Sequence, residues 1–392
     1  MAFVATSSEQ RPDTPEARQY NRTRRILSIV DFLLGLAFLL ALLFATTPRG
    51  ARWSEVLRDW AWYGARQHYA LAVFVYVGLL LLIGKLIGLA LDFYSFRLEH
   101  RYHLSNQKLR SWAWDQIKGF LVGLVLGGIV VEMIYWTIRT APQRWWLIAW
   151  AIFIGLMVFL AQIAPVVLFP LFYKFHPLEN EDLRERLVRL SEKAGTRVRG
   201  VYEWKLSEKS RKANAALTGL GRTRRIILAD TLLENYSPEE IESILAHELG
   251  HHVHRHIVKG IAVQVVITFF GFWATAALLR YAVEQQHMFE TLSDFANLPL
   301  LALVSTVMSL ALMPALNAYS RHNERQADLY ALQSIPDVAP FISSMEKLAQ
   351  QNLAERRPSK FVEWLFHSHP ATWRRIRAAE LFSRRPGTAR AR

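Results

Sequence analysis

The chain has 392 residues, of which 52% are hydrophobic and 12% aromatic, and its formal net charge is +14. It contains no cysteine, which excludes disulfide bonds, thiolate metal sites and a cysteine nucleophile and is typical of a protein that faces a reducing compartment. The apolar residues form blocks of about 20, the length at which an α-helix crosses a membrane. Because Lys and Arg lie beside these blocks, the positive charge favours membrane lipid over nucleic acid as a partner.

The N-terminal segment, residues 1–25, is polar and carries five arginines. We expect it to form a cytoplasmic tail. The apolar stretch that follows, 26–45, is long for the core of a signal peptide and has no small-residue cleavage pattern at its end. A retained membrane anchor is therefore favoured over a cleaved signal.

Six stretches are apolar enough to span a membrane, although five or seven spans are also compatible with the pattern. They are 26–46, 70–91, 117–139, 146–173, 257–280 and 297–319. Four of them form an N-terminal bundle, 26–173, and the last two form 257–319. Pro165 and Pro170 predict that the fourth bends or ends as an interfacial piece. Asp31, Lys85 and Glu132 are expected to face the bundle interior, a partner or water, because charge in contact with lipid is costly.

The orientation follows from the Lys and Arg residues of the short loops. The N-terminal segment and the loop 92–116 are basic, whereas the loop 281–296 has no Lys or Arg. The loop 47–69, with four arginines, goes against the rule. With the N-terminus inside, six spans place 174–256 and 320–382 together on the cytoplasmic side, followed by a basic tail, 383–392, that we expect to be disordered.

Residues 174–256 predict a small α+β unit. A helical period covers 183–194, a strand is indicated over 199–204, and 213–217 and 225–229 form a hairpin whose first strand is an edge strand with small side chains. Ser237, Pro238 and Glu240 then have the pattern of a capping box, so a helix is expected to begin at Pro238. We expect it to continue past His256 towards the fifth span.

Two histidines on this helix, His247 and His251, are four residues apart and therefore lie on one face. Two imidazoles so placed can both bind one Zn²⁺. Glu248, beside the first of them, can accept a proton from a water molecule that the metal activates. The alternative is an ordinary surface helix, since this stretch is rich in histidine. The motif alone favours zinc.

A third protein ligand is required. A further histidine six residues after His251 would define one class of zinc protease, but that position is Ile257. Glu324 and Asp328, just after the sixth span, are again four residues apart on one helical face. Glu324 can bind the metal while Asp328 accepts a hydrogen bond from a ligand histidine and fixes its tautomer. A solvated charged stretch is the alternative, and coupling to the two histidines makes the metal role the better interpretation.

These motifs occur in the order of a known family. The chain resembles the integral-membrane zinc metalloproteases of the type I CAAX prenyl protease family and, more distantly, the HtpX-type membrane proteases. The resemblance covers most of the chain from about residue 92 onward. It rests on Glu99-His100-Arg101-Tyr102-His103, Lys212-Ala213-Asn214-Ala215 with Arg225-Ile226-Ile227-Leu228, Leu245-Ala246-His247-Glu248-Leu249-Gly250-His251, Ser320-Arg321 with Glu324 to Asp328, and Ser368-His369-Pro370 with Arg375.

The resemblance implies a mainly α fold, in which a polytopic helical membrane protein encloses an intramembrane chamber and carries a small α+β gluzincin-type zinc-protease domain on the cytoplasmic side. It implies one Zn²⁺ per chain bound by His247, His251 and Glu324, with Glu248 as the base and with His369 and Arg375 near the scissile carbonyl. The eukaryotic enzymes have one more early span, where this chain has the segment 47–69.

The residues themselves also indicate roles for other side chains of the site. Asp328 orients a ligand histidine, and Arg375 can pair with Asp328, with Glu324 or with the substrate carbonyl. His369, held by Pro370, is a candidate hydrogen-bond donor to the developing oxyanion. Asn214 and Ala215 can hold an extended peptide by strand addition.

The predicted function is a zinc-dependent endopeptidase that cuts near the C-terminus of CAAX-type protein or peptide substrates, prenylated or not, at the membrane–cytoplasm boundary. A multi-pass location in a bacterial inner membrane, with both termini cytoplasmic, is expected. The alternatives are a quality-control protease that degrades misfolded membrane proteins and a non-catalytic membrane scaffold containing zinc. The sequence leaves the natural substrate and the oligomeric state open.

Overall fold

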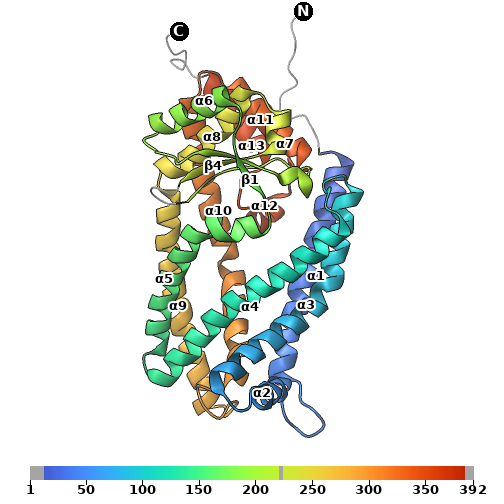
Figure 1. Ribbon diagram of the computed structural model, residues 1–392, viewed down its shortest axis with the longest axis vertical. Coiled ribbons are helices and arrows are strands. Elements are labelled where there is room, and N and C mark those ends of the chain that lie inside the picture. The colour runs from blue at the N-terminus through green and yellow to red at the C-terminus, as the bar shows by residue number, and fades with distance from the viewer. Residues whose placement is uncertain (1–12, 220–223, 385–392) are drawn as a thin grey trace, which may run out of the picture.

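The computed structural model describes residues 13–219 and 224–384. The expectations for residues 1–12 and for most of the C-terminal tail therefore lie outside the described residues. Long helices fill one end of the molecule, and a small sheet with shorter helices packed around it forms the other (Figure 1).

Six helices in the described part of the chain are long and apolar enough to cross a membrane, which confirms the predicted number. They are α1 (Pro15–Phe44), α3 (Tyr69–Arg101), α4 (Leu109–Thr140), α5 (Trp145–Ile163), α9 (His256–Glu284) and α10 (Leu298–Ser334). At Pro165 the fourth span changes from α-helix to a π-helical turn, Ala164–Leu168, and then to a 3-10 turn, Phe169–Leu171. The intramembrane chamber itself stays a prediction.

The segment between the first two spans contains a short helix, α2 (Trp53–Gly64). Its 12 residues reach about 18 Å, too little for a hydrocarbon core of about 30 Å. It lies at the end of the bundle away from the sheet (Figure 1). There Arg58 of α2 pairs with Asp294 before α10 at 2.9 Å, and Tyr135 of α4 donates a hydrogen bond to Asn297 at 2.6 Å. These contacts fasten the helices together at that end.

The sheet has four strands, β1 (Phe175–Pro177), β2 (Val201–Trp204), β3 (Ala215–Thr218) and β4 (Arg225–Ala229), in the order β1-β2-β4-β3. Strand β3 pairs antiparallel with β4 and has no neighbour on its other side among the described residues, as an edge strand requires. Helices α6 (Glu181–Lys193), α7 (Asp230–Asn235) and α8 (Pro238–Val253) complete the unit. Leu187, Ile226, Leu228 and Leu249 are fully buried in its core.

Helix α8 begins as predicted and ends earlier than predicted. Ser237 accepts a hydrogen bond from the Glu240 amide, and the Glu240 carboxylate accepts one from the Ser237 amide, which completes the capping box. The expectation of a continuous helix past His256 is wrong. Arg255 takes a left-handed conformation with φ of 56°, so the chain turns and α9 starts as a separate helix at His256. Because the chain changes direction there, the His256 ring can turn back towards α8.

The last part of the chain packs against α8 and the end of α10. Helices α11 (Ala339–Gln351), α12 (Lys360–Phe366) and α13 (Thr372–Ser383) form this layer. Ala246 of α8 shares a buried cluster with Ala331, Phe341 and Ile376, all at 3% exposure or less. The two segments with the predicted chemistry, 174–256 and 320–382, therefore meet at one end of the helical bundle (Figure 1).

Candidate metal centre and active site

Three side chains from two helices converge on one point. His247 and His251 lie one turn apart on α8, and Glu324 comes from α10. The Nε2 atoms of the two histidines are 3.3 Å apart, and each lies 3.3 Å from an oxygen of Glu324. His247 and Glu324 are buried, and His251 is partly exposed.

This arrangement fits a zinc ion. Ligands at about 2.0–2.1 Å in a tetrahedron lie roughly 3.3–3.4 Å from one another, which matches the separations of these atoms. One oxygen of Glu324, Oε2, is buried, and the described residues offer it no well-directed hydrogen bond, since its contact with His247 Nε2 is 3.3 Å long. A buried carboxylate oxygen without a donor is costly unless a cation satisfies it. Two imidazole nitrogens and one carboxylate leave a fourth position open, as catalytic zinc sites do.

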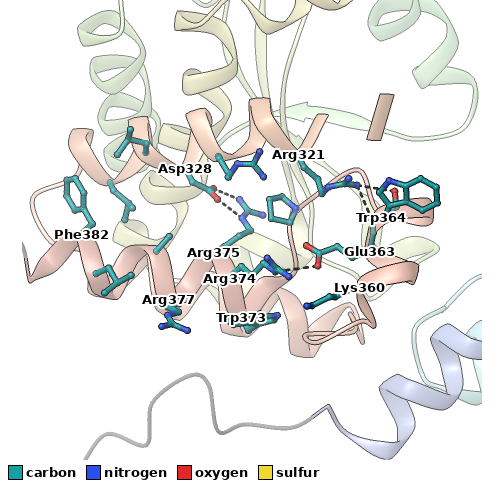
Figure 2. A pocket seen from close by; sticks show the side chains of 16 residues that line it. Arg321, Asp328, Lys360, Glu363, Trp364, Trp373, Arg374, Arg375, Arg377 and Phe382 are labelled. Atoms are coloured by element: carbon teal, nitrogen blue, oxygen red, sulfur yellow. Dashed lines mark hydrogen bonds and ion pairs between the residues drawn. The ribbon is translucent and has the colours of Figure 1, made fainter. Parts of the chain in front are cut away.

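The first histidine is held by a pair of charged residues. His247 Nδ1 lies 2.9 Å from Asp328 Oδ1. Arg375 of α13 donates two hydrogen bonds to the same carboxylate, at 2.6 and 2.9 Å (Figure 2). Burial lowers the pKa of His247, but its interactions with the Asp328 and Glu324 carboxylates outweigh burial and raise the pKa to about 9. Of the three partners considered for Arg375, the structure places it on Asp328.

The second histidine is held by residues that the sequence did not single out for this role. His251 Nδ1 lies 3.0 Å from His256 Nδ1, and His256 Nε2 lies 2.9 Å from Gln326 Oε1 of α10. The His-rich stretch after the motif was the available signal. This signal could not be interpreted without knowing the turn at Arg255, because in a continuous helix His256 would point away from His251.

Glu248 stands beside the three converging side chains. It lines a cavity of about 310 Å³ together with His251, Leu217 and Ile257. Burial raises the pKa of Glu248, while His247 and His251 act in the opposite direction. A carboxylate with a raised pKa, open to a cavity, is suited to accept and then release a proton.

His369 reaches the same place from the turn between α12 and α13. Its Nε2 lies 3.3 Å from Glu324 Oε1, and its Nδ1 lies 3.0 Å from the Ser368 hydroxyl. The side chain is 60% exposed, so it borders the open side of the site. A ring in this position can meet a bound molecule as well as Glu324.

Asn214 and Ala215 lie at the start of the edge strand, beside α8. The Ala229 amide donates to the Asn214 carbonyl at 3.0 Å, which makes these two residues a hydrogen-bonded pair of the ladder. Ala215 is opposite Leu228, the next pair along. Hydrogen-bonded and non-bonded pairs alternate in an antiparallel ladder, so the amide and carbonyl of Ala215 point to the free edge. Asn214 is exposed.

The fold and the His/His/Glu site define a membrane metalloprotease, and comparison with known proteins agrees. Residues 177–382 match the family described as Peptidase family M48. Residues 10–174 match a family described as CAAX prenyl protease N-terminal, five membrane helices. The chain therefore belongs to peptidase family M48.

Individual relatives cover nearly the whole chain. The protein named uncharacterized metalloprotease YhfN, from Bacillus subtilis, is 33% identical over 93% of this chain and 84% of its own length. The CAAX prenyl protease 1 homolog of Homo sapiens is 25% identical over 86% of this chain and 80% of its own length. The crystal structure of S. mikatae Ste24p superposes with a TM-score of 0.76 at 22% identity, covering 93% of this chain and 88% of that one, which shows a shared fold.

Proposed function

We propose that this membrane metalloprotease is a zinc-dependent endopeptidase that cuts near the C-terminus of CAAX-type substrates at the membrane–cytoplasm boundary. The observation that carries the proposal is the position of Glu248. It lies beside three converging metal-binding side chains and opens into a cavity bordered by the edge strand. A structural metal site needs no such carboxylate and usually fills all four positions with protein ligands. The names of the relatives supply the CAAX substrate class.

Each residue of the site has one role in this proposal. His247, His251 and Glu324 would hold zinc, which when bound supplies the Lewis acidity that activates water and polarises a peptide carbonyl. Glu248 accepts the proton of the attacking water and passes it to the leaving amine. His369 donates a hydrogen bond to the carbonyl oxygen as negative charge develops there. Asp328 and Arg375 keep the His247 ring in place.

The substrate would be held as an added strand. The free amide and carbonyl of Ala215 can pair with an extended peptide, and the exposed Asn214 side chain can add a hydrogen bond. Strand β3 packs beside α8, the helix that carries Glu248. A peptide on this edge would therefore pass the proposed metal ion.

The proposed setting is a bacterial inner membrane, with both termini and the site on the cytoplasmic side. The basic segment 92–116, which contains the ends of α3 and α4 and their connection, and the segment 281–296 without Lys or Arg support this orientation. The sheet and the site lie at the same end of the helices as residues 102–108, which join α3 to α4 and contact Lys209 and Ser210 through Ser105.

The test compares two peptides that differ in one group. Purified protein is incubated with a farnesylated CAAX peptide and with the same peptide unmodified, and Glu248→Gln serves as the matched inactive control. We expect release of the last three residues, with a higher kcat/KM for the farnesylated peptide. Equal cleavage of both peptides, and of an unfolded membrane protein, would favour the quality-control function. Zinc-loaded protein that cuts none of them would contradict an enzymatic role.

A further inference from the structure

A second, larger cavity lies behind the proposed metal site. It is a groove of about 730 Å³ between the end of α10, α12 and α13, and we call it the basic groove. Its lining includes six basic and two acidic side chains (Figure 2). Leu329, Leu332 and Leu381 supply part of the apolar remainder. The groove is therefore both cationic and apolar.

The acidic side chains of the basic groove are already engaged. Asp328 binds Arg375, and Glu363 pairs with Arg374 at 3.4 Å and accepts a hydrogen bond from the Ala371 amide. Arg325 and Lys360 are exposed and have no ion pair or hydrogen bond with any residue of 13–219 or 224–384. The positive charge of these two exposed side chains thus has no counter-charge within residues 13–219 and 224–384.

The groove begins at the end of the apolar stretch of α10. The part of α10 before Arg321 has no charged residue, so Arg321 marks the end of its apolar stretch. Helix α12 is fixed at this level, because Asn317 donates to the Leu365 carbonyl at 2.7 Å and Arg321 donates to the His367 carbonyl at 2.6 Å. On α12, the side chains of Phe361 and Trp364 are 63% and 50% exposed.

Exposed aromatic rings beside Lys and Arg are typical of a segment at the membrane–water interface. The rings of Phe361 and Trp364 lie together, with centroids 6.0 Å apart, and Lys360 precedes them. A soluble acidic peptide would match the charge of the groove. Its binding would not explain why Phe361 and Trp364 are exposed beside the end of the apolar stretch of α10. A molecule with an anionic head and apolar chains accounts for both.

We propose that the basic groove binds the headgroup of an anionic phospholipid from the adjoining membrane leaflet. Lys360 and Arg325 meet the phosphate, and Phe361 and Trp364 lie against the first part of the acyl chains. The inner wall of the groove is the Arg375–Asp328 pair, which also holds His247. The lipid would therefore sit one ion pair away from the proposed metal site. This proposal does not depend on which substrate the protease cuts.

Lipid binding can be measured on the full-length protein in detergent by native mass spectrometry. Phosphatidylglycerol and phosphatidylcholine of the same chain length are added at equal concentrations. We expect phosphatidylglycerol to be retained preferentially and this preference to fall in Lys360→Gln/Arg325→Gln, by about five-fold for each basic side chain removed. The matched control is Lys193→Gln/Arg197→Gln, which removes the same charge at the end of α6, away from the membrane helices. It should retain the lipid as the unmodified protein does.

Two further arms separate the lipid from other anions. Phe361→Ser/Trp364→Ser should weaken phosphatidylglycerol binding with the melting temperature unchanged, because the rings contact the chains. Inorganic phosphate at the same concentration should not displace the lipid. Equal loss in the groove and control variants, no preference over phosphatidylcholine, or displacement of the lipid by phosphate or by an added acidic peptide would each overturn the proposal.

Discussion

Gly250 of α8 lies directly against Ala327 of α10. A Cβ atom at Gly250 would lie 2.8 Å from the Ala327 Cα, closer than real Cβ atoms come, and 3.0 Å from its carbonyl oxygen, which is also tight. The two helices can approach this closely only because Gly250 has no side chain. Gly250 is next to His251 on α8, and Ala327 is one turn after Glu324 on α10, so this contact helps to set the distance between the proposed metal ligands.

Gly250→Ala should therefore weaken zinc binding. The added methyl group meets backbone, which must shift, and Glu324 moves away from the two histidines. We expect a stability loss of about 1–3 kcal/mol and a loss of bound zinc, measured by thermal unfolding and by metal analysis. Gly260→Ala is the control, since a Cβ atom there meets nothing within 4 Å. Normal zinc content in Gly250→Ala would show that the helices adjust without moving Glu324.

The roles of Glu248 and Glu324 can be separated by metal content. Glu248→Ala should abolish peptide cleavage while zinc stays near one per chain, because Glu248 lies beside the ligands without being one. Glu324→Ala, like His247→Ala or His251→Ala, should lose both activity and zinc. Metal analysis and a peptidase assay on the same samples check this. Full zinc retention in the Glu324 variant would show that Glu324 is not the third ligand.

Proline substitutions at two neighbouring positions of the edge strand should have different effects, one on substrate binding and one on stability. Ala215→Pro removes an amide that points to the free edge, so it should lower kcat/KM while zinc content and folding stay intact. Ala216, opposite Ile227, belongs to a hydrogen-bonded pair, so Ala216→Pro should destabilise the sheet instead. Asn214→Ala should impair turnover less than Ala215→Pro. Unchanged kinetics in Ala215→Pro and Asn214→Ala would mean that the substrate binds elsewhere.

His369→Ala tests stabilisation of the transition state. A positioned donor to the oxyanion is typically worth about 10²–10³ in rate, so kcat should fall by that factor with little change in KM. Zinc content and melting temperature should stay near those of the unmodified protein, because His369 is largely exposed. Ser368→Ala, which removes only the partner of Nδ1, should have a smaller effect. A change mainly in KM or in zinc content would assign His369 to substrate or metal binding.

Reporter fusions test the orientation of the six spans. Fusions after residues 110, 200 and 385 should report the cytoplasmic side, and a fusion near Gln286 should report the opposite side. This follows from the distribution of Lys and Arg in the loops. A signal on the outer side at residue 200 would contradict the proposed cytoplasmic location of the site.

Local sequence patterns determine much of the secondary structure of this protein and the spacing of its first two proposed metal ligands. Long apolar stretches predicted six membrane-length helices. In the bilayer core there is no water to hydrogen-bond the backbone, so an apolar segment that crosses it must satisfy its own backbone groups, as a helix does. The capping box at Ser237 fixed the start of α8, since it satisfies backbone donors within four residues. The four-residue spacing of His247 and His251 placed both on one helical face before any tertiary contact was known.

Only the tertiary structure decided how distant segments meet. The left-handed residue at Arg255 ends α8 and brings His256 to His251, and nothing in the local sequence requires that conformation of an arginine. Arg375 had three candidate partners, and the packing of α13 against α10 placed it on Asp328. The basic groove is built from segments that lie some 30 to 60 residues apart. Such contacts depend on the summed packing of whole helices, which no short stretch of sequence contains.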